Sequence, residues 1–382
     1  MRIAYLCKRR YMGKDVILDR YARLYEVPFQ LARLGHEVAA YCLSYRRERE
    51  AGEWLHDAAP GALAWHSQAL GLRTLAYPRY LLRQLREFAP DLLIAASDIP
   101  HVALGGWLAK RLRVPFVADL YDNFEGFGQA RIPGMVPALR QSVRGADLVL
   151  TTSEPLRDVV VNDYHARGEV LAMPSTVDKS VFHPRDRAAS RSALGLPDDA
   201  VLIGTAGGLY RAKGIDALYA AWHQLRESMP QLHLVLAGPY ESNLPPPRGE
   251  RVHYLGSLPH AQIAQLFCAL DVGVICILDT PFGRYSFPQK AYEMLACDLP
   301  VVAADVGAMG TLFAGSPRSL YETGNANNLA EKLRGQAVNP VRPDIAIEDW
   351  EQVVGRLEPG LIRLAVSRDS RRDPRDAASG AD

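Results

Sequence analysis

The sequence lacks a long hydrophobic run and an excess of charge of either sign. Its first apolar stretch, residues 3–7, ends at Lys8, Arg9 and Arg10. A signal peptide needs a longer apolar core, and a membrane-spanning helix needs about 20 apolar residues, so we expect neither. The 44 Lys and Arg residues nearly balance the 43 Asp and Glu residues. This balance gives no indication of a nucleic-acid partner, and we expect a cytoplasmic protein.

Cysteine is scarce and lacks the spacing of a metal site. The five cysteines are odd in number and form no C-x-x-C or Cys/His pattern. Most lie in apolar stretches, where cysteine behaves as a small hydrophobic side chain. We therefore expect reduced thiols and no metal site. A G-x-G-x-x-G sequence is also missing after the first apolar stretch, which makes a dinucleotide-dependent oxidoreductase less favoured.

Short apolar runs alternate with helical patterns along most of the chain. Strands are predicted at residues 3–7, 38–43, 91–96, 115–120, 147–152 and 170–173. After the helix-breaking stretch 174–197 the pattern resumes, with strands at 201–205, 233–237, 252–255, 272–277 and 301–304. Helices are predicted near 214–229, 259–270, 287–297 and 326–334. Such alternation is typical of a parallel sheet with helices on both faces, so we predict an α/β protein of two doubly wound domains.

The C-terminal region combines an apolar helical stripe with a polar end. Apolar side chains recur at steps of three and four residues: Ile347, Trp350, Val353, Val354 and Leu357. This spacing predicts a helix over residues 347–365, which Pro359 and Gly360 should break or kink. The stripe must be buried, either on its own domain or on the first one. Residues 367–382 have no apolar period, and we predict a disordered tail.

Two loops are candidates for a ligand site, because ligands of parallel sheets bind beyond the carboxyl ends of the strands. In the first loop, residues 205–214, Gly207 and Gly208 let a phosphate approach the backbone, Lys213 adds a charge, and a helix N-terminus follows. A glycine-rich turn with solvated basic residues explains the same pattern. In the second, Lys290 and Glu293 share one face of a helix. Glu293 is either a surface carboxylate near the helix N-terminus or a buried group that binds a ribose diol.

Several sequence pieces, in this order, resemble a known family. They are L-A-R-L-G-H-E-V at 31–38, M-P-S-T-V-D at 173–178, G-G-L-Y-R-A-K-G at 207–214, and P-x-K-x-x-E at 288–293, followed by P-V-V at 300–302. Together they resemble the retaining glycosyltransferases of family 4 (glycosyl transferases group 1) over residues 1–365. The resemblance implies the GT-B fold, in which two Rossmann-like domains face a cleft. It assigns residues 1–175 to the acceptor domain, 176–345 to the donor domain, and 346–366 to a helix that crosses back to the first domain.

The resemblance also implies an activity and a set of site residues. The expected enzyme is a metal-independent hexosyltransferase without a cofactor. It would move a sugar from a nucleotide-diphosphate sugar to a glycan, lipid-linked or polysaccharide acceptor, as in lipopolysaccharide synthesis. The implied catalytic residues are Asp122, Lys213 and Glu293, and Gly13 and Asp122 would face the sugar and acceptor. The implied donor-binding residues are Gly207, Gly208, Arg211, Lys213, Lys290 and Glu293.

Three positions depart from the family pattern. Tyr285 stands at the first of the two donor-site glutamates, Gly208 replaces the arginine of the G-R-L motif, and Tyr121 replaces a histidine near the sugar. A non-catalytic homologue that acts as a binding or assembly partner therefore remains an alternative, and so does a sugar-nucleotide epimerase. The acidic residues Asp119, Asp122 and Glu125 are also explained by a solvated turn.

Three basic groups raise the question of a membrane surface. They are Lys8–Arg10, Arg46–Arg47 and Lys110–Arg111. Such groups fit peripheral contact of the first domain with anionic lipid on the inner face of the membrane. Solvated helix faces explain them equally well.

Overall fold

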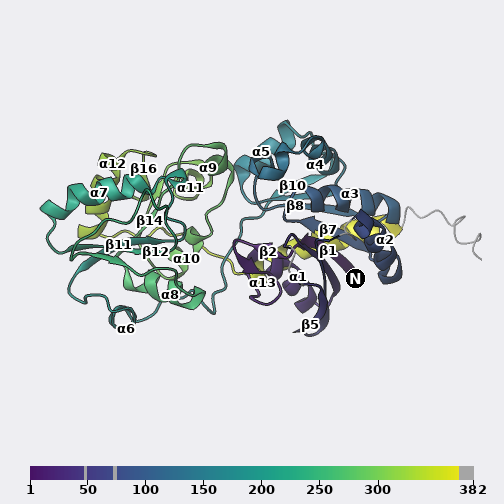
Figure 1. Cartoon of the computed structure of the whole chain (residues 1–382), viewed down its shortest axis with the longest axis horizontal. Coiled ribbons are helices and arrows are strands. Elements are labelled where there is room, and N and C mark those ends of the chain that lie inside the picture. Colours follow the sequence, from purple (N-terminus) through teal and green to yellow (C-terminus); the bar gives the residue numbers. More distant parts are fainter. Residues whose placement is uncertain (47–49, 72–74, 370–382) are drawn as a thin grey trace, which may run out of the picture. The chain divides into compact units, whose positions relative to one another are not determined.

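The computed structural model describes residues 1–46, 50–71 and 75–369 (Figure 1). The chain divides into two compact units. The first unit contains residues 1–175 and the chain from residue 350 onward, and the second contains residues 176–349. Every helix in the described part of the chain is too short or too polar to span a lipid bilayer.

The first unit is built on one eight-stranded sheet with the order β10-β9-β8-β7-β1-β4-β6-β5. In that order the strands are Glu169–Ala172, Leu148–Thr151, Phe116–Leu120, Leu92–Ala96, Arg2–Lys8, Glu37–Ser44, Gly61–Ala69 and Gly52–Ala58. All neighbouring strands are parallel except β5 and β6. Strands β7 and β8 are buried at every residue, which explains why they are continuous apolar runs in the sequence.

Helices cover both faces of this sheet, as the α/β fold class predicts. One layer contains α2 (Tyr77–Phe88), α3 (Ile99–Leu112) and α4 (Met135–Arg144), which contact one another in turn. On the other face α1 (Ala22–Arg33) packs against α13 (Trp350–Asp369). In Figure 1, α3, α4 and α5 (Glu154–Asn162) lie above the sheet and α1 lies below it.

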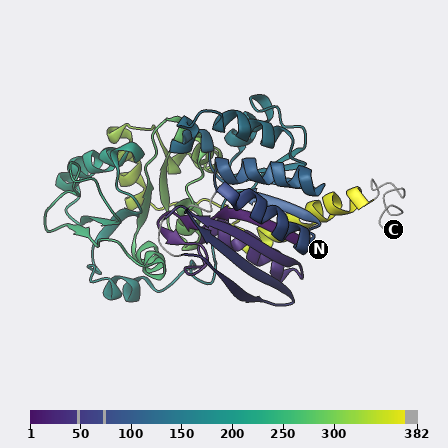
Figure 2. The same cartoon turned by 45° about the vertical axis from the view of Figure 1, so that its right-hand side comes forward.

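Between the second and third predicted strands the chain forms α2 and, before it, a hairpin of β5 and β6 that the sequence analysis did not predict. The hairpin adds an antiparallel edge strand to an otherwise parallel sheet, and it lies at the edge opposite β10 (Figure 2). The signal in the sequence is an alternation with a period of two. Leu63, Trp65 and Ser67 are buried in β6, while the residues between them are more exposed. Such alternation is typical of a strand with one solvated face.

Helix α13 continues without a break through Pro359 and Gly360, so the predicted break is wrong. The apolar stripe is buried on the first unit, with Trp350, Val354 and Leu361 each at most 3% exposed. His36 Nε2 lies 2.9 Å from Glu358 Oε1 and ties the helix to the segment that follows α1. The helix also extends through residues 367–369, where we predicted a disordered tail. Residues 370–382 lie outside the described part of the chain.

The second unit contains a fully parallel six-stranded sheet with the order β13-β12-β11-β14-β15-β16. In that order the strands are Val252–Tyr254, Leu232–Ala237, Val201–Ala206, Val272–Ile275, Val301–Ala304 and Leu320–Tyr321. In Figure 1, α7 (Ile215–Ser228) and α12 (Ala326–Val338) lie above the sheet, while α8 (His260–Ala269) and α10 (Lys290–Ala296) lie below it. The doubly wound arrangement of this unit is confirmed.

Candidate functional site

In the second unit, glycines follow three neighbouring strands and bring their loops together. Gly207 follows β11 and donates a hydrogen bond from its amide to Ala237 O over 2.9 Å. Gly238 follows β12, and its amide donates to Gly256 O over 2.7 Å. A Cβ on Gly238 would lie only 2.0 Å from Gly207 O, and both residues have φ above +100°. Only glycine fits positions of this kind, so the close approach of the two loops depends on both residues.

Lys290, the first residue of α10, reaches the carboxyl end of β11. Its Nζ donates to Ala206 O over 2.5 Å and lies 3.5 Å from Thr205 Oγ1. A Cβ on Gly207 would lie 3.4 Å from the same nitrogen. The ammonium group of Lys290 is therefore held against the Gly207 loop, at the edge of the sheet where ligands of parallel sheets bind.

The charge of Lys290 is destabilised in this position. Burial and the ammonium of Lys213 lower the pKa of Lys290 to about 8, although Cys276 and Glu293 act in the opposite direction. Two cations are thus close enough to interact beside a glycine loop. An anion bound between the two ammonium groups would weaken their repulsion and offset the cost of burying the charge of Lys290. This arrangement suits the binding of a phosphate group.

Lys213 ends a short 3-10 turn, Arg211–Lys213, and α7 begins two residues later. Gly214 lies between them with φ of +79°, and a Cβ there would be 3.0 Å from a methyl group of Leu278. The turn brings the half-buried Lys213 near the helix N-terminus, whose free amides favour an anion. Its ammonium is also 6.0 Å from the centre of the Tyr210 ring.

Not every predicted donor residue joins this cluster. Gly207, Lys213, Lys290 and Glu293 are brought together, because Lys213 and Glu293 both act on the charge of Lys290. Arg211 is exposed, and its guanidinium lies 3.5 Å from Asp216. Gly208 packs beside Tyr210, whose ring would be 2.4 Å from a Cβ at this position. The arginine that the family has at position 208 would therefore require Tyr210 to move.

Glu293 lies three residues after Lys290 and is only 9% exposed. This excludes the interpretation of Glu293 as a solvated surface residue. Its Oε1 lies 3.8 Å from His260 Nε2, at the start of α8. A buried carboxylate in reach of one histidine keeps acceptor capacity for further hydrogen bonds.

In the first unit, Asp122 follows β8 and is half-buried. Its Oδ1 accepts a hydrogen bond from the amide of Asn123 over 2.8 Å. Its charge acts on Lys8 and on the phenols of Tyr11 and Tyr121, so these side chains are its neighbours. Gly13 lies in the turn between the two-residue strands β2 (Arg10–Tyr11) and β3 (Lys14–Asp15), where it is exposed and has φ of +83°.

Lys8 is a residue of this region that the sequence did not reveal. Its ammonium lies 5.6 Å from the ring centre of Tyr121, 5.7 Å from that of Tyr11 and 5.6 Å from that of Phe127. Burial lowers the pKa of Lys8, and the carboxylates of Asp98 and Asp122 oppose that shift. Aromatic faces and carboxylates thus offset part of the cost of burying a cation at the carboxyl end of β1.

Asp98 is a second such residue, at the start of α3. Its Oδ1 lies 2.6 Å from His101 Nδ1, and Tyr45 donates to its Oδ2 over 2.8 Å. Burial alone would raise the pKa of this carboxyl group, but His101 and Tyr45 outweigh burial and lower it to about 2. Asp98 is therefore a permanent anion near Lys8.

The solvated-turn interpretation is wrong for Asp119, whereas Glu125 stays partly exposed. The side chain of Asp119 is fully buried in an ion pair with Arg23, with 2.6 Å between Oδ1 and Nη2. Glu125 pairs with Arg140 over 2.7 Å. Tyr121 is also buried, and its hydroxyl donates to Ser97 O over 2.9 Å.

The basic groups that were considered for membrane contact differ in their solvent exposure. Arg9 is 2% exposed and pairs with Asp15 over 3.0 Å, while Arg10 pairs with Glu50. Arg9 is therefore inaccessible to a lipid surface, whereas Arg10 is partly exposed. Lys110 and Arg111 are exposed at the end of α3. Arg47 lies outside the described residues.

Comparison with known proteins gives the family of this chain. Residues 23–175 match the model of the glycosyl transferase 4-like domain, and residues 200–336 match that of the glycosyl transferases group 1. These two matches fall in the two units of the structure and cover most of the chain. The chain belongs to the group 1 glycosyltransferases.

Curated relatives of this glycosyltransferase have the same family assignment. The chain is 26% identical over 313 residues to TuaC of Bacillus subtilis, whose name assigns it to teichuronic acid biosynthesis. That match covers 81% of this chain and 77% of TuaC. The chain is 32% identical over 244 residues to the D-inositol 3-phosphate glycosyltransferase of Stackebrandtia nassauensis, a match that covers 59% of this chain and 52% of that protein.

Solved glycosyltransferase structures share the fold. Sucrose-phosphate synthase from Thermosynechococcus elongatus matches with a TM-score of 0.72 and 19% identity, covering 96% of this chain and 99% of that chain. HepE of Anabaena in complex with UDP-glucose matches with a TM-score of 0.66 and 19% identity, covering 95% of this chain and 99% of that chain. These likenesses confirm the predicted GT-B fold.

Proposed function

We propose that this glycosyltransferase binds a nucleoside-diphosphate sugar on its second unit and transfers the sugar with retention of anomeric configuration. The observation that carries the proposal is the position of the Lys290 ammonium, which is held against the Gly207 loop and close enough to Lys213 to interact with it. Two cations that repel each other in the free protein are a preorganised site for a diphosphate. The leaving group of the proposed reaction is a nucleoside diphosphate.

In this proposal, Lys213 and Lys290 stabilise the charge that develops on the diphosphate as the bond to the sugar breaks. The backbone amides at Gly208 and the start of α7 add hydrogen-bond donors. Preorganised donors of this kind each lower a barrier by about 2.7–4 kcal/mol. With cations of the chain in this role we propose a metal-independent transfer. Arg211 contributes less, because it is exposed and paired with Asp216.

We propose that the donor carries a hexose and that Glu293 accepts hydrogen bonds from the ribose hydroxyls. Burial of its carboxylate within range of Lys290 supports this role. Structures of HepE with the same fold contain UDP and UDP-glucose, which makes a uridine nucleotide the first donor to test.

For the acceptor, we propose a glycan, lipid-linked or polysaccharide hydroxyl bound by the first unit, with Asp122 and Gly13 on the acceptor side. The neighbouring Lys8 and Asp98 give this region charges of both signs. The name of TuaC supports a role in the synthesis of a surface polysaccharide. Lys110 and Arg111 at the end of α3, with Arg111 stacked 5.1 Å from the Trp107 ring centre, support a peripheral contact with anionic lipid.

An NMR assay of donor consumption tests this function. The protein is incubated with UDP-glucose and, separately, with other nucleotide sugars, and the anomeric proton of the product is followed. We expect slow release of the α-anomer first, which marks retention, and loss of release in Lys213→Ala. Release of the β-anomer would contradict the retaining mechanism.

A second candidate function, a non-catalytic binding partner, is favoured by Tyr285 at the position of the first donor-site glutamate. The same assay separates the two, because a non-catalytic homologue would bind a nucleotide sugar and leave it intact.

A further inference from the structure

Two free cysteines of the second unit meet between neighbouring helices. Cys268 is the penultimate residue of α8, and Cys297 directly follows α10. The sulfur of Cys297 lies 3.8 Å from the carbonyl oxygen of Ala264, one turn before Cys268 in α8. The thiol of Cys297 also hydrogen-bonds to the sulfur of Cys268. The fold therefore brings together two thiols that are far apart in the sequence.

The surroundings of Cys268 favour its thiolate form. The hydrogen bond from Cys297 lowers the pKa of Cys268, and the backbone amide and charge of Arg185 lower it further, although burial acts in the opposite direction. Arg185 Nε is buried and has no hydrogen-bond partner among the residues that the structure describes. A buried cation with a spare N–H group beside a thiol stabilises the thiolate, which is the nucleophilic form of cysteine.

A second pair of cysteines, in the first unit, has the opposite environment. Cys7 and Cys42 stand directly opposite each other in the parallel strands β1 and β4. Burial raises the pKa of Cys7 well above its usual value and that of Cys42 to about 12. Both thiols therefore stay protonated near neutral pH, and a protonated thiol is a poor nucleophile.

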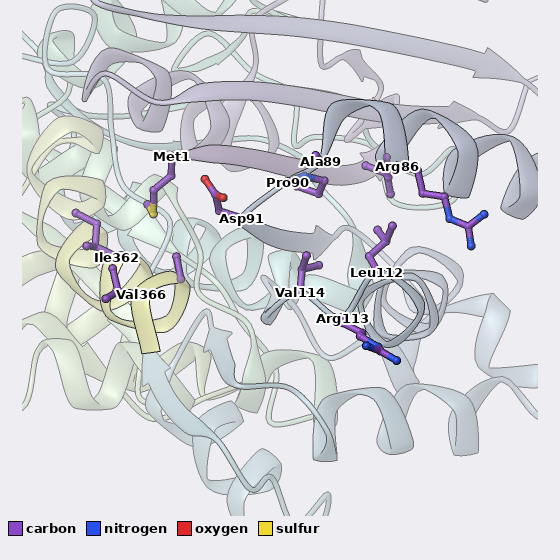
Figure 3. Close-up of a pocket in the computed structure, with 12 residues that line it drawn as sticks. Met1, Arg86, Ala89, Pro90, Asp91, Leu112, Arg113, Val114, Ile362 and Val366 are labelled. Atoms are coloured by element: carbon purple, nitrogen blue, oxygen red, sulfur yellow. The ribbon is translucent and has the colours of Figure 1, made fainter. Parts of the chain in front are cut away.

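Solvent access also separates the two pairs. Cys268 is 6% exposed, whereas Cys7 is 0% exposed. A hollow of about 470 Å³ in the first unit opens beside Met1 and Val114, just before β1 and β8 begin (Figure 3). Cys7 lies near the other end of β1, and the described residues that line the hollow include no cysteine. The hollow therefore gives a small oxidant no route to Cys7.

We propose that Cys268 and Cys297 form a redox-sensitive dithiol that hydrogen peroxide converts into a disulfide. The thiolate of Cys268 attacks one peroxide oxygen, the O–O bond breaks, and the departing hydroxide takes up the proton of the Cys268 thiol to become water. The sulfur of Cys297 then attacks the resulting sulfenic acid, so that the S–S bond forms, the S–O bond breaks and a second water leaves. In total the two thiols lose two electrons and two protons, and one peroxide is reduced to two waters.

The disulfide would crosslink two helices that already meet at Glu293. The amide of Cys297 donates to Glu293 O over 3.3 Å. On the other side, Glu293 Oε1 lies 3.8 Å from His260 Nε2 at the start of α8. Oxidation thus acts on the helix that carries Glu293, and a thiol readout tests it independently of the proposed donor.

Peptide mapping of the full-length protein tests the proposal. The reduced protein is treated with hydrogen peroxide at about pH 7, the remaining thiols are alkylated after unfolding, and the peptides are identified by mass spectrometry. We expect a disulfide between Cys268 and Cys297, with Cys268 oxidised at least about tenfold faster than Cys7 or Cys42. Equal rates for the two pairs, or loss of the Cys268 thiol without this disulfide, would overturn the proposal.

Unfolded protein is the control for the intrinsic reactivity of the thiols. In guanidinium chloride the five cysteines lose their separate surroundings, so their oxidation rates should become similar. If Cys268 keeps its advantage over Cys7 and Cys42 after unfolding, the folded environment is not its cause and the proposal is overturned.

Matched variants assign the two roles. Cys297→Ser should leave Cys268 as a sulfenic acid that dimedone captures, whereas Cys268→Ser should give no adduct on Cys297. Cys42→Ser removes a thiol of the other pair and should leave the formation of the disulfide unchanged. Dimedone capture at Cys297 in Cys268→Ser, with none at Cys268 in Cys297→Ser, would overturn the assignment of Cys268 as the attacking thiol.

Arg185 is tested through the pH dependence of alkylation. In Arg185→Met the alkylation rate of Cys268 should rise at a higher pH than in the wild type, because the thiolate loses a neighbouring cation. Arg185→Lys keeps the charge and should restore most of the shift. Identical pH profiles for Arg185→Met and the wild type would overturn the role of Arg185 in stabilising the thiolate.

Discussion

The ammonium of Lys290 donates a hydrogen bond over 2.5 Å to the carbonyl oxygen of Ala206, the last residue of β11. This contact joins two segments that are 84 residues apart in the sequence. It holds a cation against Gly207, where a side chain would crowd the ammonium at 3.4 Å. The proposed diphosphate site therefore depends on α10 and the Gly207 loop being folded together.

The lowered pKa of Lys290 predicts that nucleotide binding takes up a proton. The free protein has a Lys290 pKa of about 8, and a bound diphosphate favours the ammonium form and raises this pKa. Affinity should be constant below about pH 7 and fall as the pH rises through about 8, by at most tenfold per pH unit. Calorimetry at about pH 8 in buffers of different ionisation enthalpy should detect roughly half a proton taken up per nucleotide.

The control for this prediction is Lys290→Arg, which stays charged over the same range. The nucleotide affinity of this variant should not fall as the pH rises above about 8. If the wild type takes up no proton at this pH, Lys290 does not meet the diphosphate.

Lys213→Ala should lower turnover by at least about tenfold without unfolding the protein, because a donor to the developing charge is lost. Arg211→Ala is the matched control from the same 3-10 turn, and its effect should be smaller because Arg211 is exposed and paired with Asp216. Steady-state rates and far-UV circular dichroism of both variants check this. Equal losses in the two variants would contradict the separate role of Lys213.

Glu293→Gln should weaken the affinity for the nucleoside diphosphate, since charge-assisted hydrogen bonds are roughly twice as strong as neutral ones. A ribose contact also predicts that the wild type prefers UDP over 2′-deoxy-UDP and that the variant loses this preference. The contact with His260 at 3.8 Å offers a structural role instead. If Glu293 has only a structural role, Glu293→Gln should weaken the binding of UDP and of 2′-deoxy-UDP equally. Competitive titration of the two nucleotides distinguishes these outcomes.

For the buried pair of Arg23 and Asp119, removing one partner should destabilise the protein more than replacing both with apolar residues. Arg23 also donates to the backbone of Met173, so its charge is fully compensated in the folded unit. Asp119→Ala should cost about 3–5 kcal/mol of the free energy of unfolding, because it leaves a buried cation without its partner. Arg23→Met combined with Asp119→Leu should cost less than Asp119→Ala alone. Denaturant unfolding of the three proteins tests this, and a double variant as unstable as the single one would contradict it.

The sequence predicted the continuous apolar strands well, including the edge strands β10 and β13, and missed β5, β6 and β16, for a physical reason. Strands such as β7 and β15 are buried on both faces, so they are continuous apolar runs. Strands β5 and β6 are partly solvated, and their alternating pattern competes with helical interpretations. The two-residue strand β16 is too short to leave a periodic signal.

Within the candidate site, local motifs were predictable and contacts between distant segments were not. Gly207 and Lys213 belong to one loop, and Lys290 and Glu293 belong to one helix, so spacing alone groups them. Gly238 is required because a Cβ there would lie 2.0 Å from Gly207 O, and no spacing reveals that. Lys8 likewise gains its place from Asp98, Asp122 and Tyr121, which lie about ninety residues or more along the chain.

The most direct test of the central claim, a nucleoside-diphosphate site on the second unit, is a thermal-unfolding panel with UDP, GDP, dTDP and ADP on the full-length protein. We predict that one of them, at about a hundred times its dissociation constant, stabilises the wild type by about 2.7 kcal/mol. The same nucleotide at the same concentration should stabilise Lys213→Ala clearly less and Arg211→Ala nearly as much as the wild type. Failure of all four nucleotides to stabilise the wild type, or equal stabilisation of Lys213→Ala, would contradict the account.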